Sequence, residues 1–186
     1  MRYSKEHKDQ ARQRLVDGGA RLAKRRGFAA AGVDDLAAAA GVTSGAVYKH
    51  FSGKSALLAA IIEAELGRSA ARFAAVPAGD VKQLDKTLSA YLSTEHVDHP
   101  ELGCVLPSLA ADVARADAEV RKAFEEGLLA VHSALKRHVR SDEAAWALIA
   151  QSVGAVMLAR AMKDAALRRE VLTAVKHEAR ALARDT

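Results

Sequence analysis

Hydrophobic residues recur every three or four positions along most of the chain, which is the spacing of one face of an α-helix. Glycine and proline interrupt this pattern at Gly27, Gly41 and the segment Pro77–Asp80, where helices are expected to end. The stretch 95–105 lacks the pattern and contains Pro100 and Gly103, so we expect a loop there. The pattern predicts an all-α protein of nine helices, over residues 4–26, 33–40, 43–51, 54 to the mid-70s, 81–92, 106–116, 118–139, 142–163 and 165–184.

Composition agrees with this helical prediction. Hydrophobic residues make up 50% of the 186 positions, and there are only 3 prolines. No apolar run looks long enough to cross a membrane, and the charged start of the chain lacks a signal segment. The single cysteine, Cys104, excludes an internal disulfide framework. These features predict a cytoplasmic protein with no membrane contact.

Positive charge is concentrated in the first third of the chain. Residues 1–54 hold 11 Lys and Arg against 5 Asp and Glu, a net charge of +6, whereas the remaining residues carry a net charge of −1. This asymmetry is expected if the first third binds a polyanion such as nucleic acid. A basic but solvated helix without a partner would show the same balance.

Residues 33–51 have the pattern of a helix-turn-helix. Two short helices that cross closely need a small residue at the contact, here Ala37, and a glycine in the turn, here Gly41. Leu36, Val42 and Val47 would face inward, and the second helix would project towards the major groove of DNA. An ordinary helical hairpin has the same generic pattern.

Residues 27–62 resemble the DNA-binding domain of the tetracycline-repressor (TetR) family. The resemblance rests on Gly27-Phe28, Val33-Asp34-Asp35-Leu36-Ala37, Ala40-Gly41-Val42, Gly45, Tyr48, His50-Phe51 and Lys54-Ser55-Ala56-Leu57-Leu58. The sequence departs from the family where Ala31-Gly32 replaces the usual Ser or Thr at the start of the second helix. The resemblance implies a nine-helix TetR-like fold, with a three-helix DNA-binding domain (1–53) and a helical effector-binding and dimerisation domain (54–186).

The resemblance also assigns roles in DNA binding. Tyr48, His50 and Lys54 would contact phosphates, with Lys54 at the start of the fourth helix. Thr43, Ser44 and Lys49 would contact bases or phosphates, and Gly45 and Ala46 would let the helix approach the DNA closely. The alternative for Lys49 is a solvated side chain on an exposed face.

In this family the last two helices of each subunit form a four-helix dimer interface. The candidate interface residues in this chain are Ala150, Gly154, Leu158, Val171, Val175 and Leu182. Some of them would also serve the core of the subunit. A homodimer is expected because one recognition helix reads too few base pairs for useful specificity.

The middle helices are expected to enclose a pocket for a small-molecule effector. The candidate lining residues are Tyr91, Cys104, His132, Trp146 and Met157, and each of them is also suited to an ordinary core. Cys104 is either a reactive thiol or an inert half-buried one. His96, Asp98, His99, Glu101 and Cys104 have metal-ligand side chains, but their spacing matches no tight metal site and Pro100 limits the geometry of the loop. We expect no metal and no cofactor.

Two other classes of protein remain open at this point. The chain lacks a phosphate-binding glycine loop, a nucleophile elbow and a His-Glu-x-x-His motif, although scattered catalytic residues would leave no such signature. A protein of the same fold that answers to a protein partner, or to no ligand, is the second alternative. The preferred hypothesis is a repressor rather than an enzyme, a dimer that binds a palindromic double-stranded DNA operator and is released by a small molecule.

Overall fold

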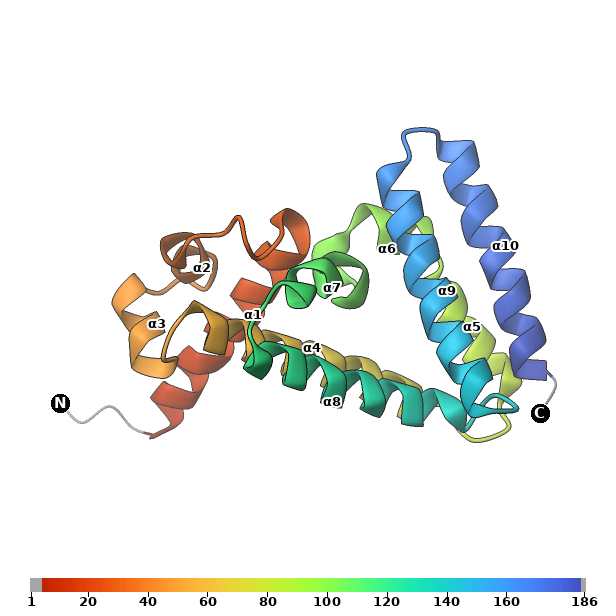
Figure 1. Cartoon of the computed structure of the whole chain (residues 1–186), viewed down its shortest axis with the longest axis horizontal. Coiled ribbons are helices and arrows are strands. Elements are labelled where there is room, and N and C mark those ends of the chain that lie inside the picture. The colour runs from red at the N-terminus through yellow and green to blue at the C-terminus, as the bar shows by residue number, and fades with distance from the viewer. Residues whose placement is uncertain (1–4, 185–186) are drawn as a thin grey trace.

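The computed structural model describes residues 5–184, with side chains described for residues 8–183. Within this range the chain is built from α-helices and one 3₁₀ turn, and it contains no strand (Figure 1). The elements are α1 (Lys5–Arg26), α2 (Val33–Ala39), α3 (Ser44–His50), α4 (Lys54–Ala74), α5 (Val81–Tyr91), α6 (Thr94–Asp98), η1 (Pro100–Leu102), α7 (Leu106–Ala114), α8 (Ala118–Lys136), α9 (Asp142–Ala161) and α10 (Ala165–Arg184). The all-α fold class is confirmed.

Each of the nine expected helices is present, but the expected loop over 95–105 is partly helical. The hydroxyl of Ser93 accepts a hydrogen bond from the His96 amide and so caps the short helix α6. Pro100 then begins η1. Burial of His96 and Val97 holds this polar segment in a helical turn that its hydrophobic pattern did not predict.

The helices α1, α2 and α3 form a compact head at one end of the molecule (Figure 1). Gly41 has φ +65, a backbone conformation that favours glycine, and it makes the turn between α2 and α3. Gly18 lets α1 approach α2, because a Cβ at this position would lie 2.5 Å from the carbonyl oxygen of Ala39. Leu15, Leu36 and Val47 are fully buried in the core of this head.

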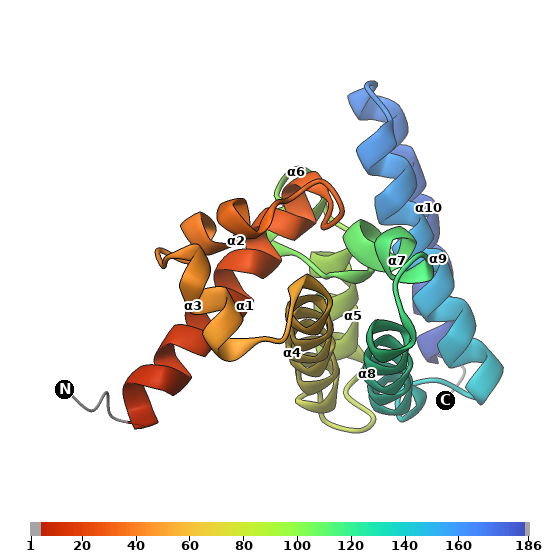
Figure 2. The same ribbon diagram turned by 60° about the vertical axis from the view of Figure 1, so that its left-hand side comes forward.

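The remaining helices form the body of the molecule. The helices α4 and α8 run side by side over most of their length, and α9 and α10 pack together at the end far from α3 (Figures 1 and 2). By length and composition alone α9 would pass as a membrane span, contrary to the sequence expectation. In this fold it packs against α8, α7, α6 and α10 instead.

Several polar contacts connect the head to the body. Lys24 of α1 is buried, and its Nζ lies 3.1 Å from Glu65 Oε2 on α4 and 2.9 Å from the carbonyl oxygen of Gly103. The carboxylate of Asp112 on α7 accepts hydrogen bonds from the amides of Phe28, at 3.3 Å, and Ala29, at 3.4 Å. Movement in the body can therefore reach the head through α1 and through the segment that follows it. The division into domains 1–53 and 54–186 remains a prediction.

Candidate functional site

The helix α3 presents a polar outer face and an apolar inner face. Val47 and Phe51, which closes the helix, are 0% and 6% exposed and anchor it in the head. Tyr48 is 63% exposed although it is a large aromatic residue. Thr43, Gly45 and Lys49 are also exposed, and Ser44, Ala46 and His50 are half-buried. The structure therefore brings seven of the eight predicted DNA-binding residues together on one short helix and its N-cap.

A basic groove lies between α1 and α3. It encloses about 530 Å³ and is lined by Lys8, Ala11, Arg14, Val42, Thr43, Ala46, Lys49 and His50. Lys8 and Arg14 were not among the predicted site residues. Their signal in the sequence is the three-residue spacing of Lys8, Ala11 and Arg14, which places all three near one side of α1. The positive charge of Lys8, Arg14 and Lys49 in this groove would attract a phosphate backbone.

Two of the predicted contact residues already have partners within the head. The hydroxyl of Ser44 donates a hydrogen bond to Asp34 of α2. Lys54, the first residue of α4, donates from Nζ to the carbonyl oxygen of Ala29 at 3.1 Å and lies 5.0 Å from the centre of the Phe28 ring. A phosphate contact by Lys54 would have to replace or share these interactions, and it stays a prediction.

The N-terminus of α2 is capped without the usual Ser or Thr hydroxyl. Gly32 is the N-cap residue, and its amide donates to Oδ2 of Asp35 at 3.0 Å. Asp34 and Asp35 lie in the first turn, where their charge suits the positive end of the helix dipole. This arrangement stabilises α2 but supplies no hydroxyl for a phosphate.

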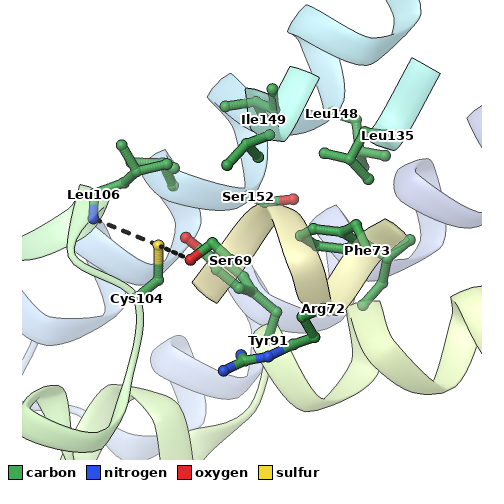
Figure 3. Close-up of a pocket in the computed structure, with 13 residues that line it drawn as sticks. Ser69, Arg72, Phe73, Tyr91, Cys104, Leu106, Leu135, Leu148, Ile149 and Ser152 are labelled. Carbon is green, nitrogen blue, oxygen red and sulfur yellow. Dashed lines mark hydrogen bonds between the residues drawn. The ribbon is translucent and has the colours of Figure 1, made fainter. Parts of the chain in front are cut away.

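A small interior cavity of about 30 Å³ lies in the body, among α4, α5, α8 and α9 (Figure 3). Its lining is mainly apolar and consists of Ser69, Arg72, Phe73, Leu88, Tyr91, Cys104, Leu106, Val131, Leu135, Leu148, Ile149, Ser152 and Val153. Ser69 and Cys104 lie at one end of it, and Leu135 and Leu148 at the other (Figure 3). Two of the five predicted pocket residues, Tyr91 and Cys104, line this cavity.

The other three predicted pocket residues lie elsewhere. His132 and Trp146 stack on each other with ring centres 4.2 Å apart, and neither ring lines the cavity. Met157 is 43% exposed on α9 and does not line it either. The residues of α8 and α9 that line it are instead Val131, Leu135 and the pairs Leu148–Ile149 and Ser152–Val153, which the sequence did not single out.

Two hydroxyl groups of the lining are buried without a partner. Within the described residues, the Oγ of Ser152 and the Oη of Tyr91 make no hydrogen bond. Burial, and then the nearby thiol of Cys104, raise the pKa of Tyr91 well above its ordinary value, so the phenol stays a hydrogen-bond donor. Unpartnered buried donors are costly, and they mark places where a ligand group or a water would be stabilised.

His96 holds the loop that carries Cys104. Its Nδ1 lies 2.7 Å from the carbonyl oxygen of Tyr91, and its Nε2 accepts a hydrogen bond from the Cys104 amide at 2.9 Å. A carbonyl can only accept, so Nδ1 carries the proton and the ring is neutral. Burial is the main cause that lowers the pKa of His96, and the charge of Arg160 adds to it. His96 thus acts as a structural bridge beside the cavity.

The acidic and histidine residues near His96 are engaged with one another rather than gathered around one point. The ring of His99 lies 3.6 Å from carboxylate oxygens of both Glu95 and Glu101. Asp98 accepts a hydrogen bond from Arg168 at 3.0 Å. Among the described residues, no three such side chains are grouped for metal binding.

The predicted dimer residues lie on α9 and α10. Ala150 and Leu158 are exposed, Leu158 by 56%, and Gly154 is half-buried. Val171, Val175 and Leu182 of α10 are half-buried and pack against the core of the subunit. Trp146, Met157 and Leu167 add further exposed apolar surface to the two helices. In a single chain the helix pair therefore exposes several large apolar side chains, most of them on α9.

Comparison with known proteins identifies the head and the fold. Residues 15–61 match the family model described as bacterial regulatory proteins, tetR family. The chain is 35% identical over 63 residues to the HTH-type transcriptional regulator TtgR of Pseudomonas putida. This stretch makes up 34% of this chain and 30% of that protein. It is 39% identical over 62 residues to the HTH-type transcriptional regulator AcrR of Shigella flexneri, 33% of this chain and 29% of that protein. The matched part thus spans about a third of these relatives.

The whole fold is shared with solved structures at low sequence identity. The crystal structure of reduced NemR from E. coli has a TM-score of 0.77 and 21% identity, and the match covers 92% of this chain and 96% of that one. A crystal structure of a transcriptional regulator from Agrobacterium tumefaciens, described as TetR family, has a TM-score of 0.73 and 17% identity, over 92% and 98% of the two chains. Residues 15–61 therefore match the tetR family of bacterial regulatory proteins, and the described chain as a whole has the fold of these solved structures.

Proposed function

We propose that the protein is a cytoplasmic transcriptional repressor that binds a palindromic operator as a homodimer and is released when a small molecule enters its body. The observation that carries DNA binding is the exposed polar face of α3 beside a groove lined by Lys8, Arg14 and Lys49. The head around it is the part of the chain that matches the family of regulators. A short helix of this kind enters the major groove, and the flanking cations neutralise phosphates.

The test of DNA binding is fluorescence anisotropy with the duplex upstream of the protein's own gene, against a random duplex of equal length. We expect tighter binding to the first duplex. The logarithm of affinity should fall with the logarithm of salt concentration by about 0.9 for each phosphate contacted. Equal and weak affinity for both duplexes would count against recognition of this sequence, and a flat salt response would count against DNA as the partner.

The proposal of a homodimer rests on the exposed apolar side chains of α9 and α10. Exposed apolar surface of this extent favours association, and a second copy would bring a second α3 to the next half-site, about 34 Å along the DNA. Replacing Leu158, which is 56% exposed, by Glu should shift the protein to monomers in sedimentation experiments. Leu129 is a matched control, because it is 54% exposed but lies on α8. Equal effects of Leu158→Glu and Leu129→Glu would refute this interface.

Release by a ligand is supported by the connection between the cavity and the head. Cys104 lines the cavity, and the preceding residue, Gly103, accepts a hydrogen bond from Lys24 of α1 at 2.9 Å. A ligand that expands the cavity would displace this segment and pull on α1. Such a ligand must bind the DNA-free conformation more tightly than the DNA-bound one, since only a difference in affinity shifts the equilibrium.

A further inference from the structure

The chemistry of the interior cavity indicates which class of molecule it accepts. Most of the lining is aliphatic or aromatic, so the bulk of the ligand must be apolar. The polar groups are the thiol of Cys104 and the hydroxyls of Ser69, Tyr91 and Ser152. Hydroxyl groups that lack partners, such as those of Tyr91 and Ser152, would each donate a hydrogen bond to an acceptor on the ligand.

The lining of the cavity carries charge of one sign. Among its lining residues, all within the described part of the chain, Arg72 is the one charged side chain, and there is no Asp or Glu. Arg160 supplies a second positive charge near Tyr91 and Cys104. Its Nη1 and Nη2 are held by Ser108 Oγ and the His96 carbonyl, each at 2.9 Å, while its Nε is buried without a partner among the described residues. A cationic ligand would find no counter-ion among the residues that line the cavity, whereas an anionic head would be stabilised by Arg72.

A second hollow of about 170 Å³ shares two lining residues with the cavity. Its polar lining residues are Arg72, Tyr91, Ser93, Glu95, His96 and His99, so it carries one carboxylate as well as the guanidinium. Arg72 and Tyr91 line both hollows, so they form the partition between them. The side chain of Arg72 is exposed and belongs to a long flexible residue, which can swing without disturbing the core. Its position allows it to meet an incoming anion and then to close over it.

The cavity must grow to hold such a molecule. Its volume of about 30 Å³ is close to that of one water in the liquid, far below the roughly 300 Å³ of a typical ligand site. Removing the partition between the two hollows is the simplest expansion, because it leaves the apolar wall of α8 and α9 in place. The acceptor group of the ligand would then lie at the Tyr91 and Arg72 end, with its apolar part against Leu135 and Leu148.

We propose that the effector is a small apolar monocarboxylic acid, bound as its carboxylate at Arg72 and Tyr91, which line both hollows, with its chain or ring among the apolar residues of the cavity. This inference rests on the proposed function, because it names the ligand class for the site that would release DNA. It differs from a general apolar pocket in requiring a negative charge on the ligand. The two requirements can be separated with compounds that share one skeleton and differ in the head group.

The experiment is calorimetric titration of the full-length protein without DNA. The probes are hexanoate, 1-hexanol and hexylammonium, together with phenylacetate, 2-phenylethanol and phenethylammonium. In at least one series we expect the acid to bind about tenfold more tightly than the alcohol, and the ammonium compound not to bind. The proposal would be overturned if, in both series, the alcohol or the ammonium compound bound as tightly as the acid. It would also be overturned if neither acid bound at millimolar concentration.

Variants locate the site of the charge preference. Arg72→Gln should abolish the roughly tenfold advantage of the acid and leave the affinity for the alcohol unchanged. Arg121→Gln is the matched control, because Arg121 is an exposed arginine on α8 that lines neither hollow. Tyr91→Phe should weaken the acid less than Arg72→Gln does, since it removes a neutral donor. An acid preference that survives in Arg72→Gln would refute the assignment.

Different results would refute the proposed function and the proposed ligand class. If an acid binds as expected but leaves the DNA complex intact in anisotropy experiments, release by this site is wrong and the ligand class stands. If neither acid binds while the operator is recognised, the ligand class is wrong and the regulator stands. Thermal unfolding with and without the acid gives an independent readout, because a bound ligand raises the midpoint.

Discussion

The basic groove beside α3 and the apolar cavity beside α4 are the two sites on which the proposals depend, and they differ in size and in the chemistry of their lining. The groove has a volume of about 530 Å³ and carries Lys8, Arg14 and Lys49. The cavity holds about 30 Å³, and its lining is mostly apolar. DNA is large and rigid, so its site must be exposed and formed in advance. A small molecule can bind inside the body. The displacement of the body that makes room for it can then move α1 and the head.

The largest expected effect on DNA binding concerns the basic groove. The double variant Arg14→Ala, Lys49→Ala should weaken operator binding by about 100-fold and reduce the salt slope by about 0.9 for each phosphate that the variant no longer neutralises. The double variant Arg121→Ala, Lys122→Ala removes the same charge from α8 and should leave both quantities nearly unchanged. Anisotropy at several salt concentrations measures both. Equal reductions in affinity for the two variants would mean that net charge, and not this groove, attracts DNA.

The second prediction concerns the contact between the head and the body at Lys24. Lys24→Met leaves the buried Glu65 with Arg68 as its remaining ion-pair partner, 2.6 Å away, and should lower the free energy of unfolding by about 3 kcal/mol. Arg25→Met is the control, because its side chain is 66% exposed and 4.0 Å from Glu101, and it should cost under about 0.5 kcal/mol. Urea unfolding measures both changes. If Lys24→Met lowered the free energy of unfolding no more than Arg25→Met does, the ion pair between Lys24 and Glu65 would contribute little to stability.

The third prediction concerns pH and the loop at the cavity. Because the folded state lowers the pKa of His96 below its usual 6.5, the unfolded state takes up this proton first as the pH falls. The stability due to the neutral ring is complete above about pH 6.5 and decreases below it. The main physical change is the loss of the hydrogen bond from the Cys104 amide, worth about 1 kcal/mol.

Unfolding measured from pH 7.5 down to pH 5 tests this prediction. The variant His96→Gln should lose part of the pH dependence seen in the unaltered protein. His177→Gln should keep it, because the His177 side chain is 82% exposed on α10. Parallel pH profiles for the unaltered protein and His96→Gln would contradict the assignment of a neutral bridging ring.

The smallest expected effect is a gain in stability at the cavity. Ser152→Val replaces a buried hydroxyl without a partner by two methyl groups that fill part of the cavity. We expect the free energy of unfolding to rise by about 1 kcal/mol and binding of the carboxylate to weaken. Ser152→Ala removes the hydroxyl without filling space, so the difference between the two variants isolates the cavity. Destabilisation by both would indicate that Ser152 has a partner, such as a bound water.

The head was predictable from the sequence to a large degree. The turn at Gly41, the buried Val47 and the exposed Tyr48 and Lys49 all follow from the order of residues within one short segment. These features depend on backbone conformation and on the helical period, which are local properties. The contribution of Lys8 and Arg14 was missed because it arises where α1 crosses α3.

The body was predictable as a set of helices but not as a site. The helix α9 has apolar residues on all sides, so its period does not indicate which side faces the cavity and which faces outward. Trp146 and Met157 were chosen for their size, and both are substantially exposed, whereas the cavity takes Ile149 and Ser152 from the same helix. The segment α6 was missed because a five-residue helix is too short to show a period.

The sequence by itself determined every α-helix of the described chain except α6, together with the turn of the helix-turn-helix motif and the outward face of α3. Each of these depends on residues a few positions apart, whose interactions are repeated in any context. Only the tertiary structure decided the basic groove, the link from Lys24 to Gly103 and the lining of the cavity. These sites are assembled from helices far apart along the chain, and packing between helices selects which of several suitable faces turns inward.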